Sequence, residues 1–177
     1  MRTPDFDPRS AHILREWPDC LMFEDSFRVS VSESVNADRP RIIQALTEPE
    51  YIETWFSPPG AVAGGTFVSS WENSLLFCWS NTDGAQSRVL CSYKLHRRSK
   101  LLLNWNPVAG STDVPKLVKI QLRGDFERTI VHVTHTGLLR SRMHFYEDLW
   151  GTSLEKLGNL FSSSGSSTLK TTKTHVP

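Results

Sequence analysis

Residues 37–56 read Ala-Asp-Arg-Pro-Arg-Ile-Ile-Gln-Ala-Leu-Thr-Glu-Pro-Glu-Tyr-Ile-Glu-Thr-Trp-Phe, and this stretch decides the fold. Asp38 can cap a helix that has Pro40 near its first turn. Thr47 can cap a second helix that has Pro49 near its start. Each helix carries one apolar stripe, formed by Ile42, Ile43 and Leu46 in the first and by Ile52, Trp55 and Phe56 in the second. Two short helices in succession predict a layer that covers a curved sheet or a long helix.

Strand patterns lie on both sides of this stretch. Before it, Phe27, Val29 and Val31 alternate with polar residues, which predicts a half-buried first strand. After it, the period is two, and turn signals stand at Asp83-Gly84 and Gly124-Asp125. The candidate strands are 66–71, 74–80, 88–96, 100–105, 116–123 and 127–135, with a longer loop from Pro107 to Pro115.

A long helix is expected to close the domain, from near Ser141 to Phe161. Its common apolar face comprises Tyr146, Trp150, Ser153, Leu154, Leu157 and Phe161. One strand, two short helices, six antiparallel strands and a long helix make an α+β order.

The run from Ala37 to Phe56 resembles the START/birch-pollen-allergen (SRPBCC) superfamily, and within it the activator-of-heat-shock-ATPase (AHSA) homologues, whose pattern is a-x-p-x-x-v-x-x-a-l-T-x-P-x-x-i-x-x-W-f. The stretch from Thr129 to Leu138 is similar to that family's last strand, and Trp150 to Leu157 to its closing helix. The resemblance covers about residues 27–161. It implies a helix-grip fold, in which a curved antiparallel sheet of six to seven strands wraps around the long C-terminal helix. Many members have Gly where Leu149 stands here, a change that could shift the helix against the sheet or shrink a cavity between them.

We therefore predict one helix-grip domain at residues 26–161. Residues 1–25 form an N-terminal extension that could carry a short helix, with Ile13, Leu14 and Trp17 on one side. This extension could pack on the domain, pair with a second copy as a homodimer, or remain a loosely attached leader. Residues 162–177 form a Ser/Thr-rich tail that we expect to be disordered.

Charge and composition limit the classes of partner that the protein is expected to bind. The net charge of +1 over 177 residues provides no long-range field for nucleic acid or acidic membranes. The basic cluster around Arg97 and Arg98 is interpreted as a solvated hairpin turn. Three cysteines without paired spacing and the lack of a long apolar run favour a soluble protein in the reducing cytoplasm, without membrane insertion.

Strand alternation nominates the residues of a ligand cavity between the concave face of the sheet and the last helix. Most of them are apolar, which favours a hydrophobic or aromatic ligand. The candidate ligand-binding residues are Trp55, Phe67, Ser69, Trp71, Tyr93, Leu103, Trp105, Ile120, Val133, His135, Tyr146 and Trp150. In the second hairpin the inward face is either Leu76, Cys78 and Ser80 or Phe77 and Trp79.

His135 and Tyr93 are the candidate catalytic residues if the protein is an enzyme. His135 ends an apolar strand face, where it could hydrogen-bond a ligand or transfer a proton near neutral pH. It could instead be a core histidine held by a backbone or Trp partner. Tyr93 could orient a ligand oxygen, or it could be a core ring with its hydroxyl at the edge.

The sequence lacks the motifs that are typical of metal-dependent, nucleotide-dependent and nucleophile-based chemistry. His132 and His135 point to opposite faces of a strand, and His144 with Glu147 lacks a third ligand, so we expect no metal. No Walker loop, dinucleotide fingerprint or nucleophile elbow is present, so we expect no cofactor.

Three functions remain. The first is binding of a hydrophobic or aromatic small molecule in the cavity. The second is a metal- and nucleotide-independent cyclase, dehydratase or hydrolase that acts on a natural-product-like intermediate. The third is a co-chaperone-like interaction module, which only the family's name implies; we do not expect a chaperone partner.

Overall fold

The computed structural model describes residues 27–107 and 116–162. The predictions for the N-terminal extension, for the loop after Pro107 and for the tail after Ser162 lie outside these residues.

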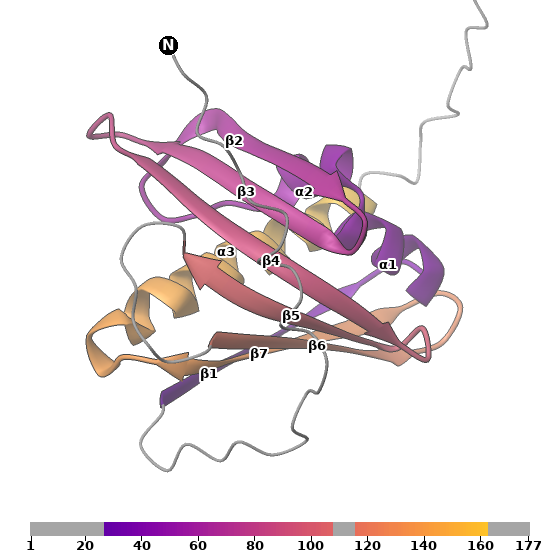
Figure 1. The fold of residues 1–177 in the computed structure, drawn as a ribbon. Helices are drawn as coiled ribbons and strands as arrows, with labels where there is room; N and C mark the ends of the chain where they lie inside the picture. Colours follow the sequence, from indigo (N-terminus) through magenta and orange to yellow (C-terminus); the bar gives the residue numbers. More distant parts are fainter. Residues whose placement is uncertain (1–26, 108–115, 163–177) are drawn as a thin grey trace, which may run out of the picture.

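The chain follows the expected α+β order (Figure 1). The elements are β1 (Phe27–Val35), α1 (Arg39–Thr47), α2 (Pro49–Trp55), β2 (Ala61–Trp71), β3 (Ser74–Asn81), β4 (Gln86–His96), β5 (Lys100–Pro107), β6 (Lys116–Gly124), β7 (Thr129–Leu138), the 3-10 turn η2 (Arg140–Arg142) and α3 (Met143–Ser162). All seven predicted strands and all three predicted helices are present, so the fold class is confirmed.

The seven strands form one antiparallel sheet in the order β1-β7-β6-β5-β4-β3-β2. The first and last strands are therefore neighbours, while β1 and β2 form the two edges. Figure 1 shows the sheet curling around α3, with α1 and α2 near the C-terminal end of that helix. Because α2 contacts both β2 and α3, the two short helices cover the opening between the sheet edges.

The start of α1 is capped as the sequence predicts. The Asp38 carboxylate accepts a hydrogen bond from the Arg41 backbone N–H at 3.0 Å. The predicted cap at Thr47 is wrong, because this residue still belongs to the last turn of α1 and its hydroxyl donates to the Ile43 carbonyl at 2.8 Å. Glu48 occupies the N-cap position of α2 without a side-chain cap. The sequence therefore predicted the start of the second helix one residue too early.

Burial alternates along the strands and identifies the inner face of the sheet. In β3 the inner side chains are Leu75, Phe77 and Trp79, which resolves the open choice for the second hairpin. In β2 the predicted inner face is wrong. Val68 is buried opposite Phe77, whereas Phe67 is 59% exposed on the outer face with Ser69 and Trp71.

The packing of α2 against the edge strand β2 explains why Val68 points inward and Phe67 outward. The Glu53 carboxylate of α2 accepts a hydrogen bond from the Val68 backbone N–H at 2.7 Å, so the helix lies beside β2 and a small side chain fits on the covered side.

The predicted apolar face of α3 is confirmed, since all six of its residues are buried. Leu149 is also fully buried, so the larger side chain fills space within the core. The helix is tied to the loop after α2, because the Ser153 hydroxyl accepts from the Ser57 backbone N–H at 2.9 Å and Lys156 donates to the Ser57 hydroxyl at 2.8 Å. Among the described residues, no helix is long and apolar enough to cross a membrane.

Candidate functional site

A group of aromatic rings lies between the inner face of the sheet and α3. We call it the aromatic cluster; its members are Phe56, Phe77, Trp105, His135, Tyr146 and Trp150. Trp105 lies 5.6 Å from both Trp150 and His135, measured between ring centroids, and His135 lies 4.4 Å from Tyr146. These are the tilted and edge-on separations at which aromatic rings attract each other.

His135 is completely buried at the inner face of β7. The indole Nε1–H of Trp150 donates to its Nδ1 at 3.1 Å. Because an indole N–H can only donate, Nδ1 must accept, and the proton of the neutral imidazole sits on Nε2. The Trp partner that the sequence left open for this histidine is therefore present.

Two buried ring nitrogens lack a hydrogen-bond partner among the described residues: Nε2 of His135 and Nε1 of Trp105. A buried donor left unpaired costs about 1–3 kcal/mol. The Trp105 Nε1–H lies near the Tyr146 hydroxyl and acts to lower the pKa of that hydroxyl. The two groups nevertheless make no hydrogen bond of good geometry. A small shift would let Tyr146 accept from Trp105, but His135 would still need an acceptor.

Burial keeps the titratable rings of the cluster neutral at pH 7. It lowers the pKa of His135 to about 3, and the nearby positive charge of Lys116 acts in the same direction. Burial also raises the pKa of Tyr146, while the Trp105 N–H and the Arg142 guanidinium partly oppose this. The cluster is thus polar but carries no charge of its own.

The positive charges of two cations, Lys116 and Arg142, act on the cluster. Lys116 begins β6 on its inner face, opposite Trp105 and two residues before Val118, which is opposite His135. It is only 9% exposed. Burial lowers its pKa, and the positive charge of Arg142 in η2 acts in the same direction. Among the described residues, no carboxylate forms an ion pair with either cation.

The structure sorts the predicted ligand-binding residues into four groups. Trp105, His135, Tyr146 and Trp150 lie together in the aromatic cluster. Leu103, Ile120 and Val133 are buried on the same inner face, and Tyr93 is half-buried there. Trp55 is buried between the short helices, where its indole N–H donates to the Ala45 carbonyl at 2.8 Å. Phe67, Ser69 and Trp71 lie on the outer face and are not part of this site.

The two candidate catalytic residues do not meet. Tyr93 on β4 is opposite Leu103 on β5, and β6 separates β5 from His135 on β7. Three strand spacings amount to about 14 Å along the sheet. Tyr146 of α3 is the phenol beside His135.

Sequence reasoning missed four residues of the site. Phe56 and Lys116 had a readable signal: Phe56 adjoins the Trp55 motif residue, and Lys116 continues the inward alternation of Val118 and Ile120. Phe77 stood in the hairpin whose face the sequence left open. Arg142 also had a signal, because it stands four residues before Tyr146 at the start of the predicted closing helix.

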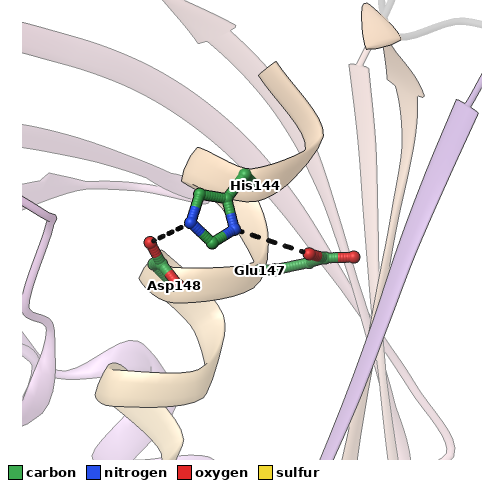
Figure 2. A network of polar contacts seen from close by, with 3 residues as sticks. All are labelled: His144, Glu147 and Asp148. Atoms are coloured by element: carbon green, nitrogen blue, oxygen red, sulfur yellow. Dashed lines mark ion pairs between the residues drawn. The ribbon is translucent and has the colours of Figure 1, made fainter. Parts of the chain in front are cut away.

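The first turn of α3 carries a small ionic group on its exposed side (Figure 2). His144 Nδ1 lies 3.9 Å from Glu147 Oε2, and His144 Nε2 lies 3.5 Å from Asp148 Oδ2. Such exposed pairs contribute little stability. Within residues 27–107 and 116–162, no group of three or more His, Cys, Asp or Glu side chains could hold a metal ion.

A separate surface pocket of about 230 Å³ lies where the start of α1 meets the β6–β7 turn. It is lined by Asp38, Arg39, Pro40, Gly124, Asp125 and Phe126. The Arg39 guanidinium donates to the Gly124 carbonyl at 2.6 Å and so joins the two sides. None of the aromatic cluster lines this pocket.

No family model matches the chain, and no curated protein matches it either. Solved structures do share its fold. A protein of Chromobacterium violaceum, CV1439, superimposes with a TM-score of 0.65 at 15% identity over 76% of this chain and 96% of the other. Protein Ms6760 of Mycobacterium smegmatis gives 0.62 at 11% identity, over 80% and 93% of the two chains. The Aha1 dimer of Colwellia psychrerythraea gives 0.58 at 15% identity, over 79% and 99%. These likenesses support a helix-grip-like fold.

Proposed function

We propose that this protein binds a hydrophobic or aromatic small molecule between the inner face of the sheet and α3, as an AHSA-like member of the SRPBCC superfamily. The observation that carries the proposal is the pair of buried ring donors, His135 Nε2 and Trp105 Nε1, that lack an acceptor in the described residues. Buried donors in native proteins nearly always have a partner. An oxygen of a bound molecule would supply one.

The surroundings of these donors suit an apolar molecule with few polar groups. Leu103, Ile120 and Val133 are almost completely buried on the same face of the sheet. Small-molecule sites typically combine such an apolar lining with a few placed hydrogen-bonding groups. The aromatic rings of Trp105 and Trp150 add flat surfaces on which a ligand ring could stack.

Binding is favoured over catalysis by the state of His135. A histidine with a pKa of about 3 is a weak base at pH 7, whereas an efficient general base has a pKa near the working pH. Tyr93 also lies three strands away from His135, so the two side chains do not contact each other. An enzyme remains the alternative, and turnover that survives in both His135→Ala and Tyr93→Phe would eliminate these catalytic roles.

Interactions with other proteins are a further alternative. The Colwellia structure is described as a dimer of Aha1, at 15% identity to this chain. Homodimer formation here is a proposal that light scattering after gel filtration tests directly, and a pull-down tests a chaperone partner. A cytoplasmic location is also a proposal; it is supported by the two free thiols, Cys78 and Cys91, in the described residues.

Tryptophan fluorescence tests the binding function. Lipids, flavonoids and polyketide-like aromatics are titrated into the full chain, and a ligand in the aromatic cluster should quench Trp105 and Trp150. The Trp71→Phe variant, which removes an outer-face ring, should keep the quenching, whereas Trp105→Phe should reduce it. A failure of all three compound classes to change the fluorescence at any micromolar concentration would contradict the proposal.

A further inference from the structure

The two buried ring nitrogens of the cluster that lack a partner among the described residues, His135 Nε2 and Trp105 Nε1, are both donors. With Nδ1 occupied by Trp150, the free nitrogen of neutral His135 carries its proton, and an indole nitrogen always does. Neither group can accept a hydrogen bond. The complementary group on a ligand is therefore an oxygen acceptor, whereas an amine or other donor would leave both buried N–H groups unpaired.

The nearby charges have one sign. Lys116 stands on the inner face opposite Trp105, and the positive charge of Arg142 lowers the pKa of both Lys116 and Tyr146. The acids at the start of α3, Glu147 and Asp148, contact His144 on the exposed side of the helix. Among the described residues, the two cations therefore have no carboxylate partner.

Lys116 is largely buried, and burial disfavours its charged form. Lysine is rarely this buried unless it is paired. Its long stem can pack along Trp105 while the ammonium reaches the edge of the cluster. An anion bound at this edge would repay the cost, because charge-assisted hydrogen bonds are about twice as strong as neutral ones.

We propose that the ligand is an amphiphilic carboxylate, with its carboxylate oxygens beside the ring donors of His135 and Trp105 and facing Lys116 and Arg142. Its aromatic or aliphatic body would lie along the inner face, against residues such as Leu103 and Ile120. This inference rests on the proposed function, because it assumes that the site between sheet and α3 takes a small molecule.

Paired probes separate the charge from the shape. Naphthoate and naphthamide have nearly the same size and ring, as do dodecanoate and dodecanol along their chains. Each is titrated into the full chain at pH 7.5, with tryptophan fluorescence as the readout. We expect each carboxylate to bind at least about tenfold more tightly than its neutral partner, which corresponds to one close charge interaction. Added salt should weaken only the carboxylates.

The variants assign the charge effect to the site. Lys116→Met keeps the stem but removes the ammonium, and it should bring each pair within about twofold. Lys119→Met is the matched control: it lies on the same strand but on the opposite face, across from Thr134, and should keep the preference. Arg142→Gln, at an exposed position, provides a second variant whose folding is not at risk, and it should reduce the preference several-fold.

The outcomes separate the two proposals. Equal binding of carboxylate and neutral partner would overturn the carboxylate inference while leaving small-molecule binding intact. A preference that survives in both Lys116→Met and Arg142→Gln would also overturn it. If none of the four probes binds, the carboxylate inference fails, and the titration with lipids, flavonoids and polyketide-like aromatics decides the binding function separately.

Discussion

The indole Nε1 of Trp150 lies 3.1 Å from Nδ1 of His135, and this hydrogen bond joins α3 to β7 inside the protein. It fixes the tautomer of the imidazole and leaves Nε2–H without a partner among the described residues. The same contact holds the helix against the last strand, so it serves the fold and the proposed site together.

Breaking this contact should destabilise the protein. Trp150→Phe removes the donor and leaves His135 Nδ1 buried without a partner, so the free energy of unfolding should fall by about 1–3 kcal/mol, plus a smaller loss of packing. Urea unfolding of Trp150→Phe, His135→Leu and the double variant forms a double-mutant cycle. A coupling free energy of about 1 kcal/mol is expected. A coupling near zero would show that the hydrogen bond contributes nothing.

Because of His135, the free energy of unfolding should decrease as the pH is lowered. Its pKa is about 3 in the folded protein and near 6.5 when unfolded, so only the unfolded chain takes up its proton between these values. This loss in the free energy of unfolding is absent above pH 6.5. It grows by about 1.4 kcal/mol for each pH unit below 6.5, down to about pH 3. Lys116 and Tyr146 face the ring, and neither supplies a negative charge to offset this.

The variant His135→Leu provides the control for this pH dependence. Other acidic groups titrate in both proteins, so the difference between the two slopes isolates the histidine. Urea midpoints measured between pH 7.5 and 4 should fall less steeply in the variant. Parallel slopes would mean that His135 takes up its proton in the folded protein as well.

The two helix starts should respond differently to alanine. Asp38→Ala removes a real cap and should cost about 1 kcal/mol of stability. Glu48→Ala removes only an exposed contact with Gln44, worth a few tenths of a kcal/mol. Thermal unfolding of both variants checks this ranking, and equal losses would contradict the cap assignment.

The β4–β5 turn offers a stabilising change. Arg97 and Arg98 have φ values of 48° and 52°, in the left-handed region that is unfavourable for arginine. Arg97→Asn with Arg98→Gly places the residues that this turn prefers and should stabilise the protein by about 1 kcal/mol or more. The control Arg97→Gln with Arg98→Gln removes the same charges without relieving the backbone. A similar gain in the control would show that charge repulsion, not backbone strain, limits this turn.

Most of the fold was predictable because local signals and burial agree. Asp38 and the two prolines mark helix starts, and the period of two from Thr66 onward marks each strand. The apolar face of α3 was also readable from its spacing. These features depend on neighbouring residues in the chain.

The site was less predictable because it depends on contacts across the fold. In β2 both faces carry apolar residues, and only the packing of α2 shows that Val68 points inward and Phe67 outward. The distance between His135 and Tyr93 could not be predicted, because strand alternation gives the face of each residue, not the order of the strands. Lys116 was overlooked although the same alternation places it inward.

The central claim is that a ligand oxygen accepts from the buried ring donors. The most direct measurement is the NMR signal of the Trp105 indole N–H, assigned through the Trp105→Phe variant and followed while naphthoate is added to the full chain. We predict a large change in its chemical shift, with little change for Trp71 on the outer face. An unchanged Trp105 signal, while naphthoate binds elsewhere on the protein, would contradict the claim.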